Sequence, residues 1–130
     1  SGIARYFLNL PSFRRFDHCI GVYMLLQRFN APFEACVAGL LHDVSHTVFS
    51  HVADYLFRGQ DNEHSYQDEI HLWYLQQYDL EQVLSSHALN LKDVDPDQFF
   101  ILEQPLPELC ADRLEYNLHT AYLWGLISKE

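Results

Sequence analysis

The 130-residue chain is predicted to fold as one all-α domain, residues 1–130, with about six helices. Apolar side chains recur with helical spacing through most of the chain, and no segment shows the strict alternation of a half-buried strand. Hydrophobic residues make up 48% of the chain, and a chain of this length can bury about two thirds of its unfolded surface. We therefore expect a single packed core, although the chain could be a fragment of something longer.

The first two predicted helices cover residues 13–29 and 32–44. In the first, apolar positions from Phe16 to Met24 fall on one helical face, which predicts that this stripe is buried. The segment before Pro32 breaks the pattern, and a proline fits well in the first turn of the helix that follows. Close approach of these two helices is expected, because each carries a glycine in its middle.

Local stop and start signals define the later helices. Gly59 is a good terminating residue for the third helix, and the Asp79 side chain can cap the short fifth helix. A connection with several prolines leads to the last helix. The predicted ranges are 50–58, 63–78, 80–87 and 107–127.

The charge distribution limits the class of partner. The net charge is −10, and residues 59–130 hold three basic and fourteen acidic residues. Such a surface repels nucleic-acid backbones and anionic lipids, so bulk nucleic-acid or membrane binding is not expected. A small phosphorylated ligand remains possible if a metal and local arginines supply positive charge. The aromatic cluster that begins at Trp73 predicts core or an interface, which leaves a homo-oligomer open.

The cysteines predict a cytoplasmic protein. Cys19, Cys36 and Cys110 are odd in number, lie among apolar residues and lack zinc-finger spacing, so we read them as reduced thiols. No apolar run approaches the roughly 20 residues needed to cross a bilayer, and the sequence does not lead us to expect a secretory signal peptide.

A histidine and an aspartate stand side by side at the end of an apolar helical stretch, at His42 and Asp43. Burying both is costly unless something pairs with them. A divalent cation would neutralise the carboxylate and use the imidazole lone pair. His18 and Asp112 lie in other apolar helices, and either alone would more often be structural or solvated. Together, the four residues predict a metal site.

The arrangement His … His-Asp … Asp resembles the HD superfamily of metal-dependent phosphohydrolases. Residues 15–22 look like the first motif of that family and residues 38–54 like the second, which is closest to the branch of deoxynucleoside triphosphate triphosphohydrolases. Residues 62–64 and 110–116 are similar to the later histidine segment and the final aspartate-plus-tyrosine segment.

The resemblance implies a role for each matching residue. The cation would be manganese, magnesium, iron, nickel or zinc, with one ion per chain favoured over two. Its implied ligands are His18, His42, Asp43 and Asp112. The residues implied in catalysis are His46, Asp54 and His64. Those implied in substrate binding are Arg15, His51 and Tyr116.

The function that follows is hydrolysis of a nucleotide or another small phosphorylated metabolite, in which water activated by the metal attacks phosphorus. One alternative is a non-catalytic, nucleotide-binding regulatory module on the same fold. The other is a di-iron oxygenase, which would need a second metal, conceivably at His64 and His87. Two further histidines carry no expected chemistry. His71 is expected on a solvated helix face, and His119 at the surface or beside the ligands.

Overall fold

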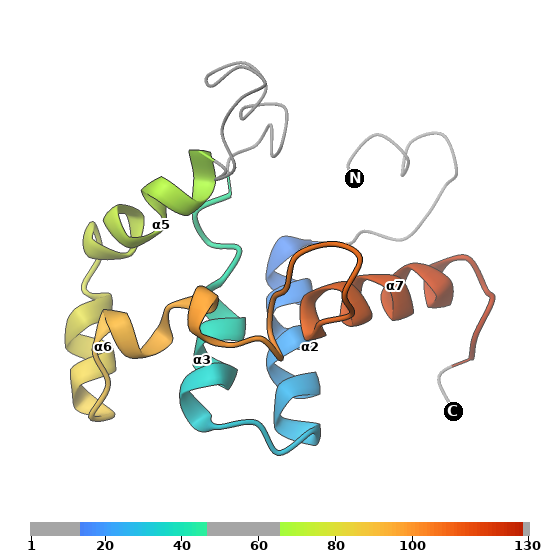
Figure 1. Ribbon diagram of the computed structural model, residues 1–130, viewed down its shortest axis with the longest axis horizontal. Coiled ribbons are helices and arrows are strands. Elements are labelled where there is room, and N and C mark those ends of the chain that lie inside the picture. Colours follow the sequence, from blue (N-terminus) through green and yellow to red (C-terminus); the bar gives the residue numbers. More distant parts are fainter. Residues whose placement is uncertain (1–13, 47–65, 129–130) are drawn as a thin grey trace.

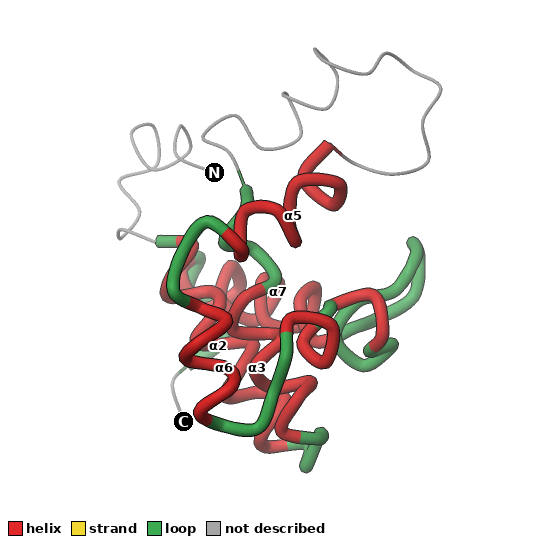
Figure 2. Tube along the Cα trace, turned by 90° about the vertical axis from the view of Figure 1, so that its left-hand side faces the viewer, coloured by secondary structure: helices red, strands yellow, loops and turns green. Residues whose placement is uncertain are grey.

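The computed structural model describes residues 14–46 and 66–128 (Figure 1). Its α-helices are α2 (Arg15–Arg28), α3 (Phe33–Leu41), α5 (Tyr66–Gln76), α6 (Leu80–Ser86) and α7 (Ala111–Leu123), with two short 3-10 helices, η1 (Leu91–Val94) and η2 (Pro96–Gln98). The described residues contain five α-helices and no strand (Figure 2). The predicted all-α fold class is confirmed. The helix expected at residues 50–58 lies outside the described ranges.

Helix α2 organises the fold, because both α3 and α7 pack against it (Figure 1). Helix α3 also contacts η1 and η2, in the connection that leads to α7, while α5 and α6 pack against each other. Helices far apart in the sequence therefore meet at α2. No helix among the described residues is long and apolar enough to cross a lipid bilayer.

One apolar cluster forms the core. Its fully buried large side chains are Val22 and Leu26 from α2, Val94 from η1, and Leu102. Gly39 on α3 lets the two helices approach, because a Cβ at this position would lie 2.6 Å from Leu26 Cδ1 and 3.0 Å from Val22 Cγ1. The expected role of this glycine is confirmed.

The buried face of α2 differs from the predicted apolar stripe. Phe16 is 68% exposed and Met24 is 61% exposed, so the prediction was wrong at these two positions, whereas Ile20 and Tyr23 of the same stripe are partly buried. The buried residues are His18, Cys19, Val22 and Leu26. Both α3 and α7 pack on the helix. His18 can be buried because its two ring nitrogens form hydrogen bonds with carboxylates of α7.

Helix α7 begins later than predicted, at Ala111 rather than near residue 107. The Cys110 side chain does not cap it. Instead, the backbone N–H groups of Ala111 and Asp112 donate to the carbonyls of Ile101, at 2.8 Å, and Leu102, at 3.2 Å. These bonds satisfy two of the four free N–H groups at the helix start and place Asp112 in the first turn.

The guanidinium of Arg113 holds the preceding loop to the same helix. It donates to the backbone carbonyls of Gln104 and Glu108. The loop therefore folds back on α7 before the helix starts. At α6, Asp79 is the N-cap residue as predicted, but its side chain makes no capping hydrogen bond.

Candidate metal centre

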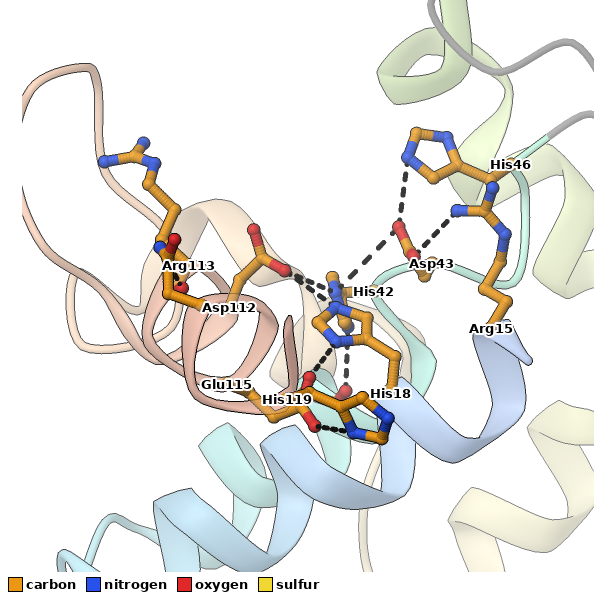
Figure 3. A network of polar contacts seen from close by, with 11 residues as sticks. Arg15, His18, His42, Asp43, His46, Asp112, Arg113, Glu115 and His119 are labelled. Carbon is orange, nitrogen blue, oxygen red and sulfur yellow. Dashed lines mark hydrogen bonds and ion pairs between the residues drawn. The ribbon is translucent and has the colours of Figure 1, made fainter. Parts of the chain in front are cut away.

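Three of the four predicted ligands lie together where α2, α3 and α7 meet (Figure 3). His18 comes from α2, His42 follows the last residue of α3, and Asp112 lies in the first turn of α7. One ligand atom from each lies within 4.8 Å of the other two. His18 Nε2 is 2.8 Å from Asp112 Oδ1, and His42 Nε2 is 3.5 Å from the same oxygen.

The orientation of His42 leaves one nitrogen available to a cation. Its Nδ1–H donates to the Gly39 carbonyl at 2.8 Å, and because a carbonyl only accepts, the proton on Nδ1 is fixed. Nε2 then carries either a second proton or a lone pair. This atom is buried and has no hydrogen-bond partner among the described residues. A buried nitrogen of this kind, facing a carboxylate, is suited to bind a metal ion.

His18 is held at both ring nitrogens. Nε2 faces Asp112, and Nδ1 contacts Glu115 Oε2 across the α2–α7 interface. The His18 and His42 rings meet edge to face, with centroids 5.2 Å apart and planes at 66°. Glu115 did not figure among the predicted functional residues. Its position in the sequence could have indicated a role at the site, because it follows Asp112 by three positions and so lies on the same face of a helix.

The protonation of the cluster follows from its burial and its carboxylates. Burial by itself would lower the pKa of His18, but the hydrogen bonds to Asp112 and Glu115 outweigh it and raise that pKa to about 9. Burial likewise opposes the charged form of His42, yet its pKa rises to about 11, chiefly through Asp112. The pKa of Asp112 is lowered, because the two histidines overcome the effect of its burial.

These shifts have a consequence for metal binding. At neutral pH the metal-free cluster holds two imidazolium ions beside carboxylates. One divalent cation carries the same charge as the two Nε2 protons it would displace. The donor set of two imidazoles and a carboxylate fits a divalent metal ion both in chemistry and in charge.

Asp43 stands beside this group. Its Oδ2 lies 2.7 Å from Arg15 Nη1, and its Oδ1 is 3.0 Å from His46 Nε2 but 3.9 Å from His42 Nε2. The carboxylate is thus directed at Arg15 and His46 (Figure 3). Its role as a fourth ligand stays a prediction, whereas its contact with two predicted active-site residues is a feature of the structure.

The turn that carries these residues is fixed by a buried pair. Ser45 Oγ and His71 Nδ1 are 2.9 Å apart, and both residues are buried, at 6% exposure. The expectation of a solvated His71 was wrong, because this side of α5 faces the turn after α3. The pair links α5 to the segment that presents Asp43 and His46.

The remaining predicted residues are only partly placed. Tyr116 follows Glu115 on α7 and is 48% exposed. His119, one turn further, has its Nδ1 3.5 Å from Glu115 Oε1. His87 is exposed at the end of α6. Three predicted residues lie outside the described ranges, and their roles stay predictions: His51, Asp54 and His64.

Comparison with known proteins places the segment that carries His18 and His42 in a known family. A family model described as HD domain matches residues 15–90. An uncharacterized protein of Bacillus subtilis, YdhJ, is 39% identical over 116 residues, which are 88% of this chain and 35% of that protein. The metal-dependent phosphohydrolase cns2 of Cordyceps militaris is 34% identical over 129 residues, which are 99% of this chain and 37% of that protein.

The relatives are all longer proteins. An uncharacterized protein of Mycoplasma pneumoniae, the MG461 homolog, is 27% identical over 85% of this chain and 32% of its own length. The chain thus spans about a third of the length of the curated relatives it matches. No solved structure matches it at a significant level.

Proposed function

The chain belongs to the HD domain family, and on that premise we propose that it is the catalytic domain of a metal-dependent phosphohydrolase. The observation that carries the proposal is the convergence of His18, His42 and Asp112 on one point, with a buried His42 Nε2 that makes no hydrogen bond to the described residues. The name of the Cordyceps militaris relative supports the same activity.

The proposed substrate is a nucleotide or another small phosphorylated metabolite. A bound divalent cation would polarise a phosphoryl oxygen and lower the pKa of a coordinated water molecule. His18, His42 and Asp112 would hold the ion, and we retain Asp43 as a fourth ligand. Membership of the deoxynucleoside triphosphate triphosphohydrolase branch is a narrower hypothesis, supported by the motif at residues 38–54.

Arg15 is proposed to bind the phosphate. Its side chain is 39% exposed beside the cluster and is paired with Asp43. A guanidinium fork matches the spacing of phosphate oxygens, so Arg15 can contact substrate from the same position. Asp54, His51, His64 and Tyr116 keep the roles that the family motifs imply.

His46 is the described residue best placed to move a proton. Its Nε2 lies 3.0 Å from Asp43 Oδ1, and a positioned imidazole is the side chain that most often transfers protons in catalysis. The reducing, cytoplasmic location that we infer agrees with three buried free thiols.

The proposal is tested with chelator-treated protein to which manganese, magnesium, nickel, iron or zinc is returned. Phosphate release from a nucleotide panel and from p-nitrophenyl phosphate is then measured. We expect turnover that needs metal and is lost in His42→Gln, while His87→Gln, which changes an exposed histidine, behaves like the wild type.

Other results would overturn it. A bound ion with no turnover on any substrate would indicate the non-catalytic module. Two iron ions per chain with oxygen consumption would indicate the oxygenase.

A further inference from the structure

We propose that Glu115 is a positioning residue that fixes His18 as a metal ligand, and that Gly21 provides the space for its carboxylate. The inference rests on the proposed metal centre and goes beyond it. It assigns a function to a contact between α2 and α7 that neither the family match nor the names of the relatives describe.

The two nitrogens of an imidazole ligand have different tasks. One nitrogen binds the ion, and the N–H of the other is normally held by a carboxylate or a carbonyl, which sets the tautomer and the ring orientation. For His42 the partner is the Gly39 carbonyl. For His18 the partner is the carboxylate of Glu115, which contacts Nδ1 and leaves Nε2 directed at Asp112.

The fold leaves space for this carboxylate at Gly21. A Cβ added at Gly21 would lie 2.8 Å from both Cγ and Cδ of Glu115, which is closer than nonbonded carbon atoms approach. Any larger residue at position 21 would push the carboxylate away from His18. Gly21 therefore serves the α2–α7 contact, whereas the sequence had suggested that it serves the approach of α3.

Glu115 is mostly buried. Its side chain is only 11% exposed, although the next residue along the helix, Tyr116, is exposed. Its second carboxylate oxygen, Oε1, faces His119 Nδ1 at 3.5 Å. A mostly buried carboxylate requires such partners, and here both are imidazoles.

Glu115 also borders a groove at the surface. Gly21, Glu115 and His119 line a groove of about 480 Å³ between α2 and α7, together with Met24, Leu118 and Tyr122. Glu115 thus lies between this groove and the ligand cluster. A change at Glu115 can alter the His18 ring without removing any ligand atom.

The test measures manganese affinity, from the electron paramagnetic resonance signal of free Mn²⁺, in variants of the whole chain. Glu115→Gln keeps the shape of the side chain but loses the charge. Because outer partners of ligating histidines typically contribute about 10- to 100-fold in metal affinity, we expect a loss of that size. Glu81→Gln, an exposed glutamate in the first turn of α6, should bind like the wild type.

A double-mutant cycle tests the role of Gly21. Gly21→Ala should weaken binding in the wild-type background, because the new Cβ displaces the carboxylate. It should add little to Glu115→Ala, in which the space is already empty. Such non-additivity is expected for residues in contact and not for distant, independent ones. Additive losses would overturn the assignment of Gly21.

A spectroscopic readout separates positioning from a general effect on folding. In the wild type loaded with diamagnetic zinc, the His18 ring should show a single tautomer with the proton on Nδ1 in ¹⁵N NMR spectra. Glu115→Gln should change the Nδ1 signal of His18 and leave that of His42 as it is.

The outcomes distinguish the two proposals. Wild-type affinity and an unchanged His18 ring in Glu115→Gln would overturn this inference and leave the metal centre in place. Failure of the wild-type chain itself to bind manganese or any other divalent ion tested would overturn both.

Discussion

His18 Nε2 lies 2.8 Å from Asp112 Oδ1, although the two residues are 94 positions apart in the chain. The contact joins the central helix of the fold, α2, to the start of α7. It depends on the backbone bonds from Ala111 and Asp112 to the 101–102 segment, which set where α7 begins. The loop before α7 is therefore part of the construction of the site.

Replacement of Asp112 by Asn should remove most of the metal affinity. The amide keeps the shape of the side chain but has no charge to offset the cation. The loss of metal affinity should therefore exceed the factor of about 10 to 100 that is typical when a hydrogen-bond partner of a ligand is changed. Metal content after dialysis, measured by elemental analysis, checks this. Asp79→Asn is the matched control, because that exposed side chain makes no capping bond. Full metal occupancy in Asp112→Asn would contradict the assignment.

The stability of the metal-free chain should fall as the pH rises. The pKa of His18 is raised from 6.5 to about 9 in the folded chain. The contribution of His18 to the free energy of unfolding is therefore fully present below pH 6.5 and is lost as the pH rises through 9. His42, whose pKa is about 11, acts in the same direction at higher pH.

Urea unfolding in the presence of a chelator, between pH 6 and 10, checks this dependence. The midpoint should fall across the range, and the fall should be smaller in His18→Gln. The pKa of Asp112 shifts in the opposite direction, below its ordinary value of 3.8. Its contribution to the free energy of unfolding is therefore present above pH 3.8 and is lost on acidification. A midpoint that rises from pH 6 to 10 would contradict the ion pairing described for the cluster.

Metal binding at pH 7 should release close to two protons. Both histidines have a pKa above 7 in the metal-free chain, and a cation needs the Nε2 lone pair of each. Calorimetry in buffers of different ionisation enthalpy counts the protons. The apparent affinity should rise with pH for the same reason. Binding without proton release would show that the ion sits elsewhere.

How far the sequence predicts this molecule can be judged from single residues. Helical periodicity and the breaks at Pro32 and Asn30 are local signals, and they give α2 and α3 to within a few residues. Asn30 has a φ of 54°, and the N–H of Ala31 returns to the Leu26 carbonyl at 3.0 Å, which closes the helix.

The sequence alone could not give the buried face of α2. Phe16 and Met24 read as core by their chemistry, yet they are exposed, and His18 is buried in their place. The burial of His18 depends on residues distant in the sequence, because its polar ring forms hydrogen bonds with carboxylates of α7. The roles of Glu115 and His71 escaped prediction for the same reason, since each depends on a partner from another element.

Arg15→Ala should weaken substrate binding without removing the metal. The guanidinium pairs with Asp43 at 2.7 Å and lies outside the His18, His42 and Asp112 group. A hydrogen bond to a charged group contributes about 1.5–3 kcal/mol, so KM should rise by about 10- to 100-fold. Steady-state kinetics on the substrate found in the panel, with Arg14→Ala as the control, checks this. An unchanged KM would exclude Arg15 from the phosphate site.

Gly39→Ala should destabilise the chain and disturb the metal centre together. The added Cβ would lie 2.6 Å from Leu26 Cδ1, and because Leu26 is fully buried it has little room to move. Overpacking of this kind costs about 1–3 kcal/mol. The Gly39 carbonyl also accepts from His42 Nδ1, so a shift of α3 away from α2 would turn the His42 ring. Thermal unfolding and manganese affinity, measured on the same preparation, should both decline. A loss of stability with unchanged manganese affinity would show that the His42 ring stays in the cluster when α3 shifts. It would contradict the coupling between core packing and metal binding that we predict at Gly39.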